Sequence, residues 1–101
     1  MHSRRDTREE KYKGELVALI HRIRDTSLLR AFLEDLLSPA EWDEVARRWQ
    51  VIKLLQKGLP QRSIAKQVHV GVATITRGFR ELEDPKGGFQ QIFKQLQNKK
   101  V

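Results

Sequence analysis

The stretch QRSIAKQVHVGVATITRG, residues 61–78, decides the fold of this chain. Its apolar residues are spaced as on the facing sides of two helices joined by a tight turn: Ile64, Ala65, Val68, Val70, Val72 and Ile75. The small Ala65 permits the close approach that two steeply crossing helices need. The pattern predicts a helix-turn-helix, with Val70 filling the turn and His69 at the position that favours a left-handed backbone.

The predicted outer face of the second helix carries Ala73, Thr74 and Thr76, with Arg77 at its side. Short neutral or hydroxyl side chains suit a helix that enters a groove lined by base edges. Lys and Arg outnumber Asp and Glu by 20 to 13, which gives a net charge of +7 and favours a polyanionic partner. Together these features indicate binding to double-stranded DNA.

The composition excludes several other classes of protein. The chain has 101 residues and no cysteine, so we expect one domain without disulfides or a thiolate nucleophile. His2, His21 and His69 show no metal-ligand spacing, and no catalytic constellation is visible, so we expect neither an enzyme nor a metal site. Because there is no long apolar run and no signal peptide, we expect a soluble cytoplasmic protein.

Helical periodicity without any strand signal predicts an all-α fold of six helices. The first is expected to begin at Arg8, after the capping-box spacing of Thr7 and Glu10. Ser38, Pro39 and Glu41 predict the start of the third helix, which should end at Gly58. The predicted organisation is a basic arm, one helical domain containing the helix-turn-helix, and a frayed tail: residues 1–6, 7–97 (with 60–83) and 98–101.

The first two predicted helices carry broad apolar stripes, from Tyr12 to Ile23 and from Leu28 to Leu36. A compact monomer that closes these stripes on each other is one interpretation. We favour a homodimer, because a small helical domain gains stability by burying such stripes against a second chain, and two symmetric reading helices suit a palindromic site.

Several segments resemble the trp repressor family of bacterial transcription regulators: LSPAEWDEVARRW (37–49), LLQKG (54–58), QRSIAKQ (61–67) and GVATITRG (71–78). The resemblance covers Leu37 to Leu82, and GVATITRG is its most specific part. It implies an intertwined, all-helical homodimer that represses transcription by binding an operator when L-tryptophan, as co-repressor, fills a pocket beside each reading head.

The resemblance also implies a set of ligand-binding residues. Arg48 and Arg77 match the arginines on the two faces of the indole ring, and Arg77 also matches the one that holds the carboxylate. Gly78 matches a position that leaves room for the ring, while Leu37 and Ser38 fall at the pocket rim. Guanidinium planes stack well on aromatic rings. Without the resemblance, both arginines read as solvated or phosphate-binding residues.

Two features depart from the tryptophan-sensing members of the family. Glu81 stands where those members place a small hydroxyl near the ammonium group of the ligand; a carboxylate there either pairs with that ammonium or repels the ligand carboxylate. The turn at residues 58–61 is one residue shorter than in those members. The shorter turn, together with Trp49 after Arg48, resembles a sibling branch with a different effector or none.

At the DNA, Arg62 resembles the family's guanine-binding arginine, and Gln61 and Ser63 at a helix start suit phosphate binding. Lys66 is a further phosphate candidate. The reading helix contributes the remaining candidates, whose methyl and hydroxyl groups suit thymine methyls and bases: Gly71, Val72, Ala73, Thr74 and Thr76.

Two alternatives stay open from the sequence. One is a DNA-binding module that senses no ligand, such as a replication-initiation or sigma-like element. The other is a helical protein–protein adaptor that uses the apolar helices at either end of the chain.

Overall fold

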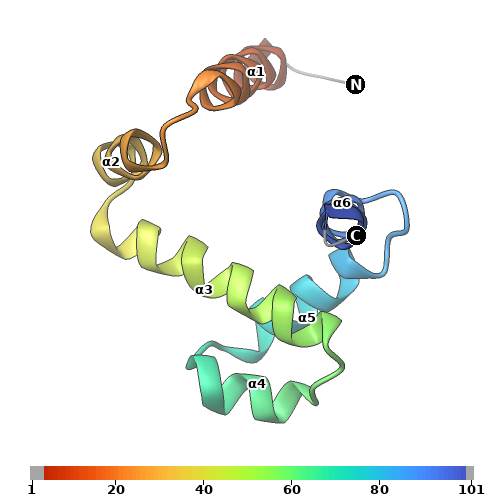
Figure 1. Ribbon diagram of the computed structural model, residues 1–101. Helices are drawn as coiled ribbons and strands as arrows, with labels where there is room; N and C mark the ends of the chain where they lie inside the picture. The colour runs from red at the N-terminus through yellow and green to blue at the C-terminus, as the bar shows by residue number, and fades with distance from the viewer. Residues whose placement is uncertain (1–3, 100–101) are drawn as a thin grey trace. The chain divides into compact units, whose positions relative to one another are not determined.

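The computed structural model describes residues 4–99, which form six α-helices and no strand (Figure 1). Their bounds are α1 Arg4–Arg22, α2 Thr26–Leu36, α3 Pro39–Gln56, α4 Gln61–Val68, α5 Val72–Leu82 and α6 Gly88–Lys99. The predicted all-α class is confirmed. None of these helices is long and apolar enough to cross a membrane. The chain divides into two compact units, Met1–Trp42 and Asp43–Val101, which we describe in turn.

In the first unit, α1 begins at Arg4, about one turn before the predicted start. Residues 4–6 of the predicted arm are therefore helical, and residues 1–3 lie outside the described range. No glycine or proline precedes Gly14, so nothing stops the helix from extending past the capping-box spacing. Asp25 caps α2: its carboxylate accepts a hydrogen bond from the Ser27 N–H at 3.4 Å.

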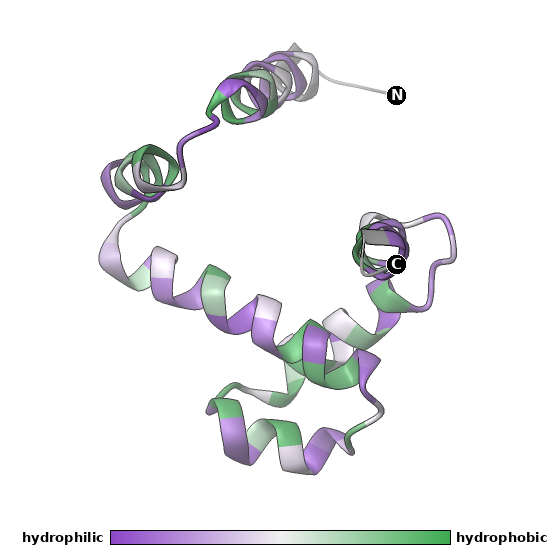
Figure 2. Cartoon of the chain, in the orientation of Figure 1, coloured by the Kyte–Doolittle hydropathy of each residue, from purple (hydrophilic) through white to green (hydrophobic). Residues whose placement is uncertain are grey.

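The apolar side chains of α1 and α2 are not buried within one chain. From residue 7 to Trp42, every residue is exposed or half-buried, and α2 contains no buried residue. The most exposed of the large apolar side chains here are Tyr12, Val17 and Leu28. Figure 2 shows hydrophobic residues along both helices. This unit therefore gains little apolar burial from its own chain.

The start of α3 has the predicted capping box. The Ser38 N–H donates to Glu41 Oε1 at 2.8 Å, and the Glu41 N–H donates to Ser38 Oγ at 3.2 Å. Pro39 is the first helical residue, where its missing N–H costs nothing. The Ser38 N–H, and secondarily the Ser38 hydroxyl, lower the pKa of the Glu41 carboxyl below its ordinary value.

The second unit has its core where the C-terminal half of α3 meets α4 and α5 (Figure 1). Ile64 and Ile75, the predicted inner-face residues, are 0% and 1% exposed. They pack with Val51 and Leu54 of α3, against which further residues are half-buried: Leu55, Leu59, Ala65, Val68 and Val70. The predicted positions of Ala65, Val68 and Val70 in this seam are thus confirmed.

The prediction for Val72 as an inner-face residue was wrong, because its side chain is 72% exposed. Val72 is the first residue of α5. Val70 before it and Ile75 after it already fill the interface between α4 and α5. On α3, Val45 is exposed, whereas Val51 and Leu54 are buried. Apolar residues lie on several faces of this half of α3, so spacing alone does not identify the face that packs.

Two turns shape the helix pair. After α3, Gly58 has φ 88°, a conformation that glycine adopts without steric cost. Between α4 and α5, His69 has φ 60° and ψ 51°, and its N–H donates to the Ala65 carbonyl at 3.0 Å. The left-handed backbone predicted at His69 is confirmed. It ends α4 and turns the chain into α5.

Substitution of His69 tests the cost of this turn. His69→Gly is expected to raise the free energy of unfolding by about 0.5–1 kcal/mol, because a left-handed backbone costs a residue with a Cβ but not glycine. Gln67→Gly, the same change two residues earlier inside α4, is expected to lower it by about as much. Urea unfolding measures both values, and a loss of stability in both variants would contradict the assignment.

The capping box generates a second prediction. Ser38→Ala is expected to lower the free energy of unfolding by about 1 kcal/mol, because the Glu41 N–H loses its acceptor. Ser63→Ala, at an exposed position inside α4, is the control and should change it by less than about 0.5 kcal/mol. Equal effects of the two changes in urea unfolding would argue against a capping role.

The contribution of Glu41 to folding stability depends on pH in a defined direction. Because the folded-state pKa of Glu41 is lowered, its stabilising contribution is present above the unfolded-state pKa and is lost as the pH falls through the folded-state pKa. The stability difference between wild type and Glu41→Gln should therefore shrink on acidification, as followed by urea unfolding at several pH values. A difference that grows in acid would contradict this.

Candidate functional site

A pocket of about 460 Å³ lies within the second unit, between α3, α5 and the start of α6. Its walls combine apolar and charged side chains: Arg48, Val51, Ile52, Ala73, Thr74, Arg77, Gly78, Glu81 and Phe89. The size falls within the range of about 300–1,000 Å³ that is typical of small-molecule sites.

The apolar wall comes mainly from α3 and α6. Val51 and Ile52 are 1% and 2% exposed and are held by the core beneath them. Phe89 is half-buried at the first turn of α6. Trp49 follows Arg48 on α3, and Phe93 lies one turn after Phe89 on α6. Their rings stack with centroids 5.5 Å apart and an angle of 16° between their planes. This stack fixes α6 against α3 and thereby fixes Phe89 as a wall of the pocket.

The loop before α6 also positions Phe89. The Lys86 N–H donates to Asp84 Oδ1 at 3.0 Å, and the Gln90 side-chain amide donates to the Leu82 carbonyl at 2.6 Å. The first bond lies within the loop, and the second connects the end of α5 to the first turn of α6. Phe89 was not among the predicted ligand residues, because nothing local in the sequence shows that this loop returns α6 to the pocket.

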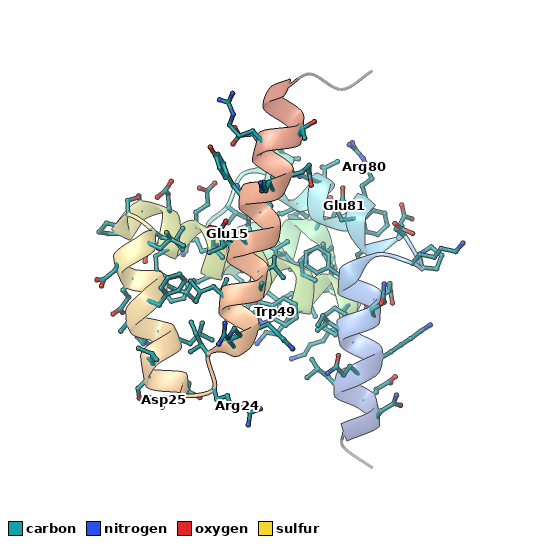
Figure 3. All side chains as sticks on the ribbon, turned by 90° about the horizontal axis from the view of Figure 1, so that it is seen from above. Glu15, Arg24, Asp25, Trp49, Arg80 and Glu81 are labelled. Atoms are coloured by element: carbon teal, nitrogen blue, oxygen red, sulfur yellow. The ribbon has the colours of Figure 1, made fainter. Side chains whose placement is uncertain are left out.

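Three charged side chains line the pocket. Arg48 forms an ion pair with Glu44 across one turn of α3, with 3.0 Å between Nη2 and Oε1. Both side chains are more than half exposed, so the pair is weak and leaves Arg48 free to move. Arg77 and Glu81 lie one turn apart on α5, and neither has an ion-pair partner among the residues whose side chains are described. Figure 3 labels Glu81 and its neighbour Arg80.

Gly78 is buried where α5 crosses α3. A Cβ added there would lie 2.9 Å from Ile52 Cδ1, closer than Cβ atoms normally approach. The sequence interpretation assigned this glycine to space for a ring. That role stays a prediction; the structure adds that Ile52 takes the space that a methyl group on residue 78 would occupy. The glycine therefore allows the close approach of α5 to α3, and it lines the pocket as a consequence.

The pocket contains four of the six predicted ligand residues, namely Arg48, Arg77, Gly78 and Glu81. The other two belong to the first unit. Leu37 is the C-cap of α2, and Ser38 caps α3, so a rim role for either remains a prediction. Val51 and Ile52 also line the pocket but were not predicted as ligand residues, although their spacing of three and four residues from Arg48 places all three on one side of α3.

The predicted phosphate- and base-binding residues of α4 are exposed: Gln61, Arg62, Ser63 and Lys66. Pro60, the N-cap of α4, makes no side-chain hydrogen bond to the helix start. The first N–H groups of α4 therefore lack a side-chain cap, as an anion-binding helix start requires. Among the residues whose side chains are described, neither Arg62 nor Lys66 forms an ion pair.

The start of α5 is also accessible, since Gly71, Val72, Ala73 and Thr76 are exposed. Thr74 is half-buried and lines the pocket, and its predicted contact with DNA stays a prediction. Ala73 both lines the pocket and is exposed. Helix α5 thus lines the pocket with one of its faces and exposes its first residues to solvent on another face. In residues 4–99 the structure shows no group of three potential metal ligands.

Comparison with known proteins identifies the family. The family model described as Trp repressor protein matches residues 12–97. A protein of Vibrio campbellii named "Trp operon repressor homolog" is 37% identical over 78 residues, which cover 74% of this chain and 78% of that protein. An Actinobacillus succinogenes protein of the same name is 45% identical over 53 residues, 52% of each chain.

No solved structure matches the chain significantly. The family match spans far more than half of the sequence, including all of α3, α4 and α5. The chain therefore belongs to the Trp repressor protein family.

Proposed function

We propose that this protein is a sequence-specific transcriptional repressor that binds operator DNA with L-tryptophan as its co-repressor. One observation carries the proposal: α5 forms a wall of the pocket and also presents the exposed residues predicted to read DNA. An occupant of the pocket thus contacts the reading helix directly. Membership of this family accounts for the lack of any enzymatic signature in the sequence.

The residues of the pocket fit tryptophan. Val51, Ile52 and Phe89 supply the apolar surface that an indole ring requires. Arg48 and Arg77 supply guanidinium groups that stack on aromatic rings, and a guanidinium also binds a carboxylate through two parallel hydrogen bonds. Arg77 has no ion-pair partner within the described side chains, so it is available for the ligand carboxylate.

The proposed switch acts through the angle between α3 and α5. A ligand that contacts both helices favours the arrangement in which it makes the better contacts. It shifts the protein toward the DNA-binding arrangement only by the difference between its affinities for the two arrangements. Ala73 and Thr74 would transmit this preference, since they line the pocket at the start of the reading helix.

The proposed repressor is a homodimer. The apolar side chains of α1 and α2 are left unburied by a single chain, and a second copy would cover them. Two-fold symmetry then supplies two reading helices for a palindromic operator. Because α5 carries few long side chains that reach base edges, we expect DNA shape and bridging water to contribute to specificity.

Glu81 favours a second candidate, a DNA-binding regulator of this family with a different effector. A carboxylate in the pocket restricts the ligands that fit, because it repels any anionic group placed beside it. The adaptor interpretation differs from both candidates, since it requires neither the pocket nor the exposed residues of α4.

Calorimetry tests the co-repressor. L-tryptophan is expected to bind the wild type, and Arg77→Ala should weaken this binding at least about tenfold by removing a charge-assisted contact. Arg80→Ala, an exposed arginine of the same helix that does not line the pocket, is the matched control and should retain binding. Absence of heat with L-tryptophan, tryptamine and indole in the wild type would favour the second candidate.

DNA binding is tested on a duplex selected from a random pool and on unrelated duplexes. Arg62→Ala should weaken binding to the selected site more than to unrelated DNA, by about 1–3 kcal/mol, because a bidentate contact to guanine is lost. Lys66→Ala should weaken both equally and reduce the salt slope by about one. If the regulatory activity in cells survived both changes, the adaptor interpretation would replace the proposal.

A further inference from the structure

Within residues 4–99, His69 is the one residue other than glycine that has a positive φ. It lies in the connection between α4 and α5 (Figure 1), where glycine would adopt the same backbone without steric cost. A residue with a Cβ in an unfavourable backbone region directs attention to what its side chain does. The His69 side chain is exposed and forms no hydrogen bond or ion pair with the described residues. No contact within this part of the chain therefore accounts for the imidazole.

His69 lies between the two groups of residues that are proposed to bind DNA. Arg62 and Lys66 are one turn apart on one face of α4, and His69 follows Lys66 by three residues at the end of the same helix. Gly71, the N-cap of α5, and Val72, its first residue, come directly after the turn, and both are exposed. A DNA strand that contacts both α4 and the start of α5 therefore passes close to the turn that carries His69.

The charges on the helices around His69 favour an anionic partner. Between Glu44 and Glu81 the sequence contains no Asp or Glu. Glu44 is paired with Arg48, and Glu81 lies about 13 Å along the helix axis from the start of α5. Neither carboxylate forms an ion pair with His69 in the described structure. The basic residues of this segment are Arg47, Arg48, Lys53 and Lys57 on α3, Arg62 and Lys66 on α4, and Arg77 and Arg80 on α5.

An imidazole at such a place differs from the lysines and arginines around it, because its charge changes between about pH 5 and 8. A neutral imidazole can donate one N–H to a phosphate oxygen, whereas the protonated ring forms a charge-assisted bond that is about twice as strong. A phosphate beside the ring favours the protonated form, so a proton is taken up from the solvent when the contact forms. Lys and Arg stay charged over this range and produce no such dependence.

We propose that His69 binds a DNA phosphate through its protonated imidazole, so that this protein binds DNA more tightly as the pH falls through the neutral range. Each chain takes up a proton from the solvent on binding and releases it on dissociation. Because the contact is to the DNA backbone, it strengthens binding to any duplex and leaves the sequence preference unchanged. This inference rests on the proposed function, in that it takes α4 and α5 to contact duplex DNA.

The test measures the binding of labelled duplexes by fluorescence anisotropy at about pH 6 and about pH 8, with L-tryptophan at one concentration throughout. Wild type is expected to bind both the selected site and an unrelated duplex about five- to tenfold more tightly at the lower pH. The salt slope should also be steeper there by about one per chain, because one more phosphate is neutralised. His69→Asn should remove most of both differences, since Asn tolerates a left-handed backbone but carries no charge.

His21→Asn is the matched control. His21 is an exposed histidine of α1, so this change removes the same ionisable group from another part of the chain. It should leave the pH effect unchanged within about twofold. His69→Gly is a second variant, which is expected to be more stable than wild type and also to lack the pH effect. Circular dichroism at both pH values verifies that each variant keeps the helical fold, so that a lost effect is not a loss of structure.

The outcomes separate this inference from the proposed function. If wild type binds DNA equally at both pH values, or if His69→Asn keeps the full pH effect, the phosphate-binding role of His69 is wrong while DNA binding stands. If the effect falls equally in His21→Asn, it does not arise at the turn and the role is again wrong. If well-folded wild type binds neither duplex at either pH, both the role and the proposed function fail.

Discussion

The second unit depends on the close approach of α5 to α3, where Gly78 lies against Ile52. Any side chain on residue 78 would contact Ile52 Cδ1, so the glycine determines how closely α5 packs against α3. Because of this close packing, Ile75, one turn earlier on α5, is buried in the core. Arg77 and Glu81 are thereby brought to the rim of the apolar wall, and Val72 is left exposed. The pocket and the predicted DNA-reading surface thus follow from one helix contact.

The features that the sequence predicted correctly are mainly local ones. The capping box of Ser38 and Glu41 and the left-handed His69 each depend on residues a few positions apart. The seam between α4 and α5 was also predictable, because both helices are short and their connection leaves few ways to pack. Local physical chemistry decides such elements, so their sequence spacing is informative.

The remaining features depend on contacts between distant segments. Periodicity on α3 did not distinguish Val51 and Leu54 from Val45, because several faces of that helix are apolar. The position of Phe89 at the pocket depends on non-local contacts, among them the Gln90 bond to the Leu82 carbonyl and the stack of Trp49 on Phe93. The predicted ligand residues Arg48, Arg77, Gly78 and Glu81 line one pocket, but the close contact of Gly78 with Ile52 joins distant segments and could not be predicted from spacing.

The unburied apolar stripes of α1 and α2 have a consequence for how the protein responds to its own abundance. In the proposed homodimer, these helices become stable only on association, so folding and assembly are linked by mass action. At low expression, the dissociated chains would expose their stripes to proteases and chaperones. The amount of active regulator would then rise more steeply than the rate of its synthesis.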